Sequence, residues 1–312
     1  MENNGKGILE GNLACLTAYL IFGFNIICCK NIANDGLISP MALYLLRALG
    51  ALTLFVLSGL VFRKSFRVET SDIWKIAVAS FLGMFLTQFS FLKAITMTTA
   101  IDASIMSVLS PVMTMVIAAI AIKDRISAHG VAGLALSIAG VLMLILNTRT
   151  VGGGADHTTI GGIALMLVNT LSFALYVGIF KPLIQKYSVI TFMTWMFMFS
   201  SAYALPFGFK ELISVPYSAI PSGIILQTAY VIIGATFVSY FLIPFGQKKL
   251  RPYIVCMYSY VQPVVAMVIS LAIGLDTMNW QKGLATVLVF LGVTIVNFSP
   301  RQFIPKTKKA VS

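Results

Sequence analysis

The sequence predicts an all-α membrane protein with ten transmembrane helices, arranged as two inverted five-helix repeats. Three observations predict this fold: an apolar composition, a series of apolar segments about 20 residues long, and a similarity between the two halves of the chain. Of the 312 residues, 58% are hydrophobic and 10% are charged, and the mean hydropathy is +0.93. Because a soluble domain carries about 25% charged residues, this composition excludes a soluble globular protein and a disordered chain.

The apolar segments have the length that a helix needs to cross a bilayer. The first is interpreted as a retained span rather than a signal peptide, because it contains Asn12 and Asn25 and no small-residue cleavage site follows it. The second begins at Pro40, a residue that is tolerated at the start of a helix. The ten expected spans are 11–31, 40–62, 72–94, 99–121, 129–147, 160–181, 189–208, 223–247, 252–274 and 280–298.

Basic residues in the connections predict the orientation. With the N-terminus inside, sixteen of the 22 Lys and Arg residues fall in inside segments, five fall in outside loops, and Arg47 lies within a span. Cytoplasmic loops of membrane proteins are enriched in these residues. We therefore expect a multi-pass protein of the cell (inner) membrane with both termini cytoplasmic. The net charge of +12 follows from this bias, so no nucleic-acid partner is expected.

The second half of the sequence repeats the first. A shift of 152 residues aligns 107–141 with 259–293 without a gap, and ten of the 35 pairs are identical, including Pro111 with Pro263 and Gly140 with Gly292. A shift of 151 residues aligns the first span with the sixth. Each copy holds five spans, an odd number, so the second copy enters the membrane from the opposite side. Inverted repeats of this kind are typical of transporters, whose substrate sites lie near the membrane midplane between the repeats.

The domain boundaries follow from this duplication. The first repeat is expected over 8–147 and the second over 160–299. The loop 148–159, which contains three consecutive glycines, joins them, and a basic cytoplasmic tail covers 300–312.

Several motifs resemble the EamA-type transporters of the drug/metabolite transporter superfamily, over roughly residues 10–298. The second half departs from the family pattern at Ala174, where the first half has Gly23, and both halves carry Asp where the family most often has Glu. The matching residues are Gly23-Phe24-Asn25, Lys30, Arg47, Leu109-Ser110-Pro111-Val112, Asp124 and Gly140-Val141, and in the second half Gln262-Pro263-Val264, Asp276 and Gly292-Val293.

The resemblance implies a secondary transporter that exports small metabolites such as amino acids by alternating access. Uptake or exchange of phosphorylated metabolites, nucleotide-sugars or drugs by the same fold stays open, and a non-transporting membrane scaffold is the remaining alternative. The expected partners are a small-molecule substrate and the lipid bilayer, with a homodimer left open.

Polar and aromatic side chains within the spans are the candidates for a substrate cavity, because polar residues in a membrane usually face protein or water. Tyr19, Phe22 and Asn25 recur every three residues on one face of the first span, and the repeat shift pairs Gln88 with Tyr240. Hydrogen bonding between helices is the alternative role for such residues. The expected cavity residues are Tyr19, Phe22, Asn25, Gln88, Ser107, Asn169, Ser172, Tyr176, Tyr240, Ser259 and Gln262.

Prolines and charges within the spans have separate expected roles. Pro111 and Pro263 remove a helical hydrogen bond near the middle of spans four and nine, so both are expected to kink their helices beside the cavity. Arg47 is either a structural anchor or a group that attracts anions. Lys93 and Asp102 flank a short turn and are expected to pair with each other. Asp124 and Asp276 are expected to cap the helices that follow them.

The sequence contains no pattern typical of an enzyme or a metalloprotein. Ser, His and carboxylate residues do not assemble at a catalytic spacing, and the glycines of the long loop precede no phosphate-binding motif. The four cysteines show no CxxC spacing and are interpreted as packing residues. No catalytic activity, metal or cofactor is therefore expected.

Overall fold

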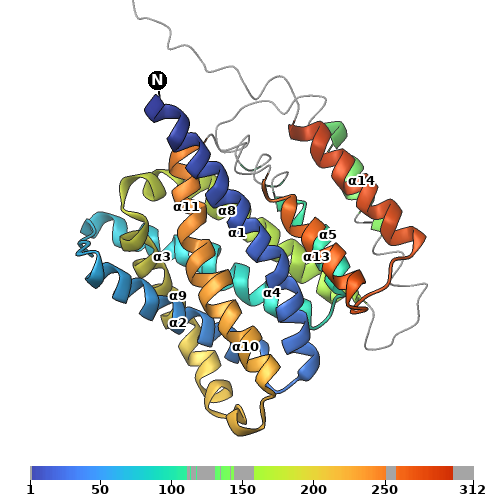
Figure 1. Ribbon diagram of the computed structural model, residues 1–312, viewed down its shortest axis with the longest axis horizontal. Helices are drawn as coiled ribbons and strands as arrows, with labels where there is room; N and C mark the ends of the chain where they lie inside the picture. Colours follow the sequence, from blue (N-terminus) through green and yellow to red (C-terminus); the bar gives the residue numbers. More distant parts are fainter. Residues whose placement is uncertain are drawn as a thin grey trace, which may run out of the picture.

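The computed structural model describes residues 2–110, 113, 117, 131–133, 135–140, 142–143, 158–250 and 258–297, and every regular element in these residues is a helix (Figure 1). Pro111, Asp124, both histidines and Cys256 lie outside the described residues. The expectations for Pro111 and Asp124 therefore stay predictions.

In the first half, α3, the π-helix η1 and α4 follow one another without interruption and form one long segment, Thr70–Ile95. The helices of this half are α1 (Glu2–Asp35), α2 (Pro40–Val61), α3 (Thr70–Ser80), η1 (Phe81–Leu86), α4 (Thr87–Ile95), α5 (Ala100–Ser107) and an apolar helix Val131–Gly140.

In the second half, α10, the π-helix η3 and α11 likewise form one continuous segment, Ser222–Lys249. The helices of this half are α8 (Ile160–Lys186), α9 (Val189–Ile213), the 3₁₀-helix η2 (Tyr217–Ala219), α10 (Ser222–Tyr230), η3 (Val231–Val238), α11 (Ser239–Lys249), α13 (Val261–Ala272) and α14 (Trp280–Asn297).

Capping residues explain where several helices begin. Ser39, Thr99, Thr159 and Ser188 each accept a hydrogen bond from the backbone N–H three residues ahead, at 3.1–3.2 Å. Such a cap satisfies one of the four N–H groups that a helix start leaves without a partner. The starts of α2, α5, α8 and α9 are therefore encoded locally, and they fall at or within one residue of the spans expected from the sequence.

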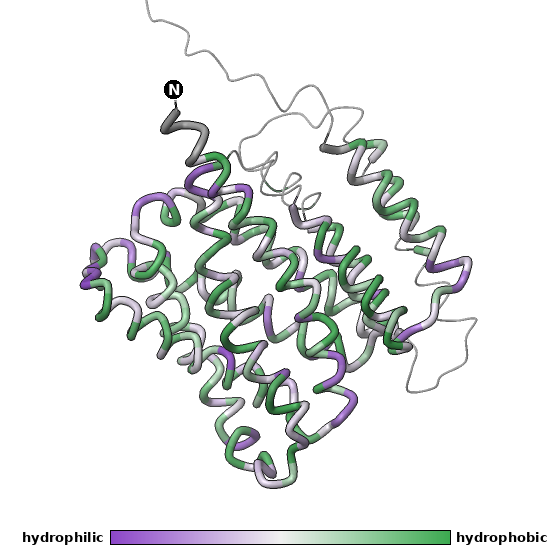
Figure 2. Tube along the Cα trace, in the orientation of Figure 1, coloured by the Kyte–Doolittle hydropathy of each residue, from purple (hydrophilic) through white to green (hydrophobic). Residues whose placement is uncertain are grey.

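Helix length and composition identify a membrane protein. Among the described residues, six helices are long and apolar enough to cross a bilayer. Large apolar side chains such as Leu60, Phe207 and Leu226 are exposed on them, and hydrophobic residues run along the length of the helices (Figure 2). A bilayer accommodates an apolar surface of this kind.

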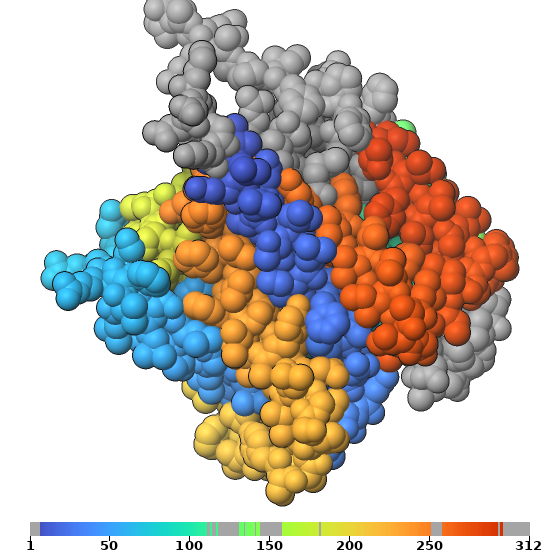
Figure 3. All heavy atoms as spheres, in the orientation of Figure 1, coloured from blue at the N-terminus to red at the C-terminus, as the bar shows by residue number. Residues whose placement is uncertain are grey.

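The principal helix contacts join the two halves of the chain. α2 packs on α9, α1 packs on α11 and α13, α4 packs on α8, and α5 packs on α13. In the space-filling view, the surface of α1 lies between segments of the second half on both sides (Figure 3). The contact of α1 with α11 corresponds, under the repeat shift, to that of α8 with α4.

The helix Val131–Gly140 and α14 cross closely at two glycines that the repeat aligns. A Cβ on Gly140 would lie 2.6 Å from Val289 Cγ2 and 2.9 Å from the carbonyl oxygen of Ala285. A Cβ on Gly292 would lie 2.5 Å from the carbonyl oxygen of Gly133 and 2.6 Å from the backbone nitrogen of Ser137. Only glycine permits helix backbones to approach this closely.

Candidate functional site

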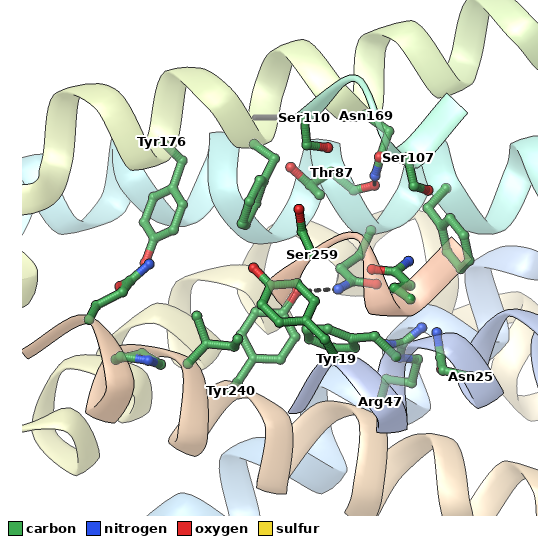
Figure 4. A pocket seen from close by; sticks show the side chains of 18 of the residues that line it. Tyr19, Asn25, Arg47, Thr87, Ser107, Ser110, Asn169, Tyr176, Tyr240 and Ser259 are labelled. Atoms are coloured by element: carbon green, nitrogen blue, oxygen red, sulfur yellow. Dashed lines mark hydrogen bonds between the residues drawn. The ribbon is translucent and has the colours of Figure 1, made fainter. Parts of the chain in front are cut away.

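A cavity of about 130 Å³ lies between the two halves of the chain, lined by side chains from both (Figure 4). α1, α2, α4 and the end of α5 contribute from the first half, and α8, α9, α11 and α13 from the second. The lining residues are Tyr19, Phe22, Asn25, Arg47, Thr87, Gln88, Phe91, Ser107, Ser110, Asn169, Phe173, Tyr176, Met193, Tyr240, Ile243, Pro244, Gln247, Ser259 and Gln262.

Ten of the eleven residues expected at a cavity lie in this lining, together with Arg47. Ser172 is the exception: it is buried, and its hydroxyl donates to the carbonyl oxygen of Leu82 at 2.7 Å, in the interface between α8 and η1. It thus makes the helix-to-helix hydrogen bond that was the alternative role for these residues. The apolar lining residues Met193 and Ile243 were not among the expected residues, because nothing in the sequence distinguishes them from packing residues in a membrane helix.

Aromatic rings form much of the wall. Phe22 contacts Tyr19 and Tyr240 edge-on, with ring centroids 5.9 and 6.0 Å apart. Gln88 Nε2 donates a hydrogen bond to the hydroxyl of Tyr240. Gln88 and Tyr240 are a pair that the repeat shift aligns, so two equivalent positions of the halves meet in the cavity wall. A Cβ on Gly83 would lie 2.4 Å from Tyr176 Cγ, which places the Tyr176 ring directly on the η1 backbone.

Two π-helices flank the cavity at equivalent positions of the halves, a feature that the apolar pattern did not reveal. The hydroxyls of Thr87 and Ser239 donate to carbonyl oxygens five residues back, those of Leu82 at 2.7 Å and Gly234 at 3.2 Å. The two donor residues are 152 positions apart in the sequence, and so are the two acceptor residues, which is the repeat shift. Asn169 Nδ2 also donates to the carbonyl oxygen of Thr87 at 2.7 Å. π-Helical turns occur often at functional sites.

Helix interruptions lie beside the cavity, and one of them directly precedes Pro263, the residue expected to kink its span. α13 begins at Val261, directly after a turn at residues 259–260, so Pro263 lies in the first helical turn. Proline is tolerated there because the first N–H groups of a helix have no intrahelical partner. α5 also ends in a turn at 108–109, where the N–H groups of Val108 and Leu109 donate three residues back. Interrupted helices within a membrane line cavities or are covered by protein.

Buried charges gather at the end of the bundle where α1 ends and α5 begins. We name Lys30, Asp102, Thr158, Asp276 and Lys282 the Asp102 cluster. Lys282 Nζ lies 2.8 Å from Asp276 Oδ1 and 4.0 Å from Asp102 Oδ1, and all three side chains are at most 7% exposed. Thr158 donates to Asp102 Oδ2, and Lys30 Nζ donates to the carbonyl oxygen of Thr98 at 2.8 Å.

The Asp102 cluster corrects two expectations. Asp102 does not pair with Lys93, which is exposed, but approaches Lys282 from the other half. Asp276 does not cap the helix that follows it: Asn279 Oδ1 accepts from the Lys282 N–H instead, at 2.8 Å. Asp276 Oδ2 accepts from the Ile101 N–H at 3.2 Å, so the carboxylate lies at the N-terminus of α5, where the helix dipole favours negative charge.

A second charged group, the Asp72 cluster, lies at the opposite end, where α3 begins and α8 ends. It consists of Glu69, Asp72, Lys75, Lys186 and Tyr187. Lys186 Nζ lies 2.7 Å from Asp72 Oδ2 and 2.6 Å from Glu69 Oε2. These two hydrogen bonds raise the pKa of Lys186 above its ordinary value. Unlike the Asp102 cluster, it contains solvated side chains: Lys186 is 40% exposed and Glu69 61%.

Comparison with known families decides the identity of the chain, because the EamA-like transporter family matches both residues 9–146 and residues 160–298. The chain belongs to the EamA-like transporter family. It is therefore a multi-pass membrane transporter and not an enzyme. In the described residues, no group of three or more His, Cys, Asp and Glu side chains could hold a metal ion.

Curated relatives of this EamA-family chain carry transporter names. The chain is 25% identical over 230 residues to "Uncharacterized transporter YetK" of Bacillus subtilis, covering 72% of this chain and 68% of the relative. It is 22% identical over 298 residues to "Uncharacterized inner membrane transporter YicL" of Salmonella typhimurium, covering 94% and 97%. A solved structure titled "Crystal structure of protein" shares the fold with a TM-score of 0.66 at 15% identity, covering 95% of this chain and 99% of that one.

Proposed function

We propose that this transporter exports small polar or amphipathic metabolites, such as amino acids, by alternating access through the cavity between two inverted five-helix repeats. The repeats are placed at 8–147 and 160–299, with ten spans in all and both termini in the cytoplasm. The observation that carries the proposal is the cavity between the two halves. Each half contributes an interrupted helix to the cavity lining, at Ser107 in the first half and at Ser259 in the second. Substrate sites of inverted-repeat transporters lie at such interruptions near the midplane.

The packing supports the inverted arrangement. The repeat shift relates the contact of α1 with α11 to the contact of α8 with α4. The π-helices η1 and η3 also occupy equivalent positions of the two halves. Two similar units joined face to face can rock against each other around a fixed central site.

The two charged clusters support an alternating mechanism. In the proposed orientation the Asp102 cluster lies at the outer end of the bundle and the Asp72 cluster at the inner end. The cavity lining extends to Gln247, near the inner end of α11. The buried Asp102 cluster would close the outer end in this conformation, and opening it would require Lys282 to separate from the first half.

The proposal is tested with purified protein in liposomes that contain a mixture of radiolabelled amino acids. We expect efflux of at least one solute, saturable at high concentration, and a loss of most of that efflux in Tyr176→Ala and Gln262→Ala. Both side chains line the cavity, so truncation removes wall contacts without touching the charged clusters.

Matched controls are Tyr217→Ala and Gln281→Ala, because neither side chain lines the cavity and Tyr217 is exposed. These variants are expected to transport as the wild type does. If the cavity and control variants lose transport equally, the cavity is not the pathway. If none of the amino acids leaves the liposomes, the proposed substrate class is wrong.

A further inference from the structure

Arg47 is a buried cation in the wall of the cavity. It lies two turns into α2, its side chain is 2% exposed, and it is among the largest fully buried side chains of the described residues. Its guanidinium group lies beside Asn25 in the cavity (Figure 4). Burial of a charge in a membrane protein is costly, and charges kept there usually mark a functional site.

The contacts of Arg47 are with neutral groups. Nε donates to the hydroxyl of Thr236 at 2.9 Å, and Nη1 lies 3.9 Å from Cys29 Sγ, a weak acceptor. No Asp or Glu of the described residues belongs to the cavity lining. Asp102, a buried carboxylate of the first half, lies outside this lining and is close to Lys282. The guanidinium charge therefore has no counter-charge in the cavity wall that the structure describes.

The first turn of α13 adds positive potential on another wall. α13 begins at Val261, and Ser259 and Gln262 on either side of that start line the cavity. The N-terminus of a helix carries a partial positive charge and N–H groups that suit anions. Asn25 Oδ1 accepts from Cys29 Sγ at 3.5 Å, which directs the amide NH₂ group of Asn25 away from that contact.

The remainder of the cavity wall suits a ligand that has an apolar body and some polar groups. Phe22, Phe91, Phe173, Tyr176 and Tyr240 supply aromatic faces. Because Arg47 is the one Lys or Arg among the described lining residues, the cavity provides compensation for a single negative charge rather than for the two charges of a phosphate ester.

We propose that the cavity binds small monocarboxylates with an apolar or aromatic body, and that the carboxylate binds to the Arg47 guanidinium. This inference rests on the proposed function and names its substrate class. A guanidinium donates two parallel hydrogen bonds to a carboxylate, and these complete the charge pairing that Arg47 lacks in the wall.

Four probes that share a phenyl ring and differ in charge test the inference. They are 3-phenylpropionate, 3-phenylpropanamide, phenylethylamine and phenyl phosphate. Thermal unfolding of the purified protein is followed with each. We expect 3-phenylpropionate to raise the Tm of the wild type and the other three to have little effect. In Arg47→Met, binding of 3-phenylpropionate should weaken about 10- to 100-fold, and Arg47→Lys should keep part of it.

The ligand-free variants separate a binding role from a structural role. If the role of Arg47 is to bind the substrate carboxylate, Arg47→Met removes an uncompensated buried charge and should leave the Tm of the ligand-free protein unchanged or raise it. If Arg47 anchors the fold, the Tm falls. Arg67→Met, a charge removal at an exposed arginine outside the cavity, is the matched control and should bind 3-phenylpropionate as the wild type does.

The outcomes also separate this inference from the proposed function. Equal binding of the neutral or cationic probe, tighter binding of the phosphate, retained binding in Arg47→Met, or no response to any probe each overturns the inference. The proposed function nevertheless stands if amino acids are transported in a manner that depends on Gln262. It fails if no amino acid is transported, or if the cavity variants and their control variants lose transport equally.

Discussion

Lys282→Met is expected to cost about 3–5 kcal/mol in the free energy of unfolding, the range measured when one partner of a buried ion pair is removed. Lys282 is the cation that faces both Asp102 and Asp276, and all three side chains are buried. Without it, two carboxylates stay buried at the interface of the halves. Thermal unfolding of purified protein, followed by tryptophan fluorescence, measures the loss as a decrease in Tm.

Lys93→Met is the matched control for Lys282→Met, because Lys93 is an exposed lysine on α4, which ends at the turn before α5. It should change stability by no more than about 0.5 kcal/mol. Adding Asp102→Asn to Lys282→Met should restore part of the Tm, since one of the uncompensated charges is then removed. If Lys282→Met and Lys93→Met unfold at the same temperature, the Asp102 cluster does not hold the halves together.

Gly292→Leu is expected to prevent the close crossing of α14 with the helix Val131–Gly140, at a cost of more than about 3 kcal/mol. Any Cβ at this position meets two backbone atoms at 2.5 and 2.6 Å, and backbone within a helix cannot move aside as a flexible side chain can. The measurement is the yield of monodisperse protein in detergent together with its Tm.

Gly283→Ala is the matched control, since it lies on the same helix and a Cβ there has no neighbour within 4 Å. It should be neutral or stabilise the protein by up to about 1 kcal/mol, because alanine is a better helix former than glycine. Gly140→Leu, at the aligned position of the first half, should be about as damaging as Gly292→Leu. Full stability of Gly292→Leu would contradict the crossing.

The residues whose place in the cavity lining follows from helical periodicity or from the repeat could be named from the sequence. Tyr19, Phe22 and Asn25 share a helix face, so their spacing alone places them together. The repeat shift pairs Gln88 with Tyr240, and these two side chains form a hydrogen bond. Both features are local or symmetric, and the sequence expresses each directly.

Contacts between distant segments could not be predicted in the same way. Asp102 lies close in sequence to Lys93, yet its cation is Lys282, 180 residues away. Asp276 stands just before a helix, yet its carboxylate contacts the start of α5. In each case tertiary packing overrides the nearest local partner, because a buried carboxylate requires a cation or N–H group that is itself buried.

The sequence does not reveal the π-helices, for a different reason. A π-helical segment such as η1 or η3 keeps the composition of the surrounding apolar helix, so hydropathy does not distinguish it. Thr87 and Ser239, the hydroxyl residues at equivalent positions after each segment, are the signal in the sequence that could have indicated it.

Topology is the most direct test of the central claim, which is that two oppositely oriented halves enclose one pathway. Epitope tags are inserted at residues 152–154 and after Ser312, and their accessibility is measured in intact and in permeabilised cells. The account predicts that the tag at 152–154 is reached from outside and that the C-terminal tag is reached only after permeabilisation. Detection of both tags on the same face of the membrane would contradict it.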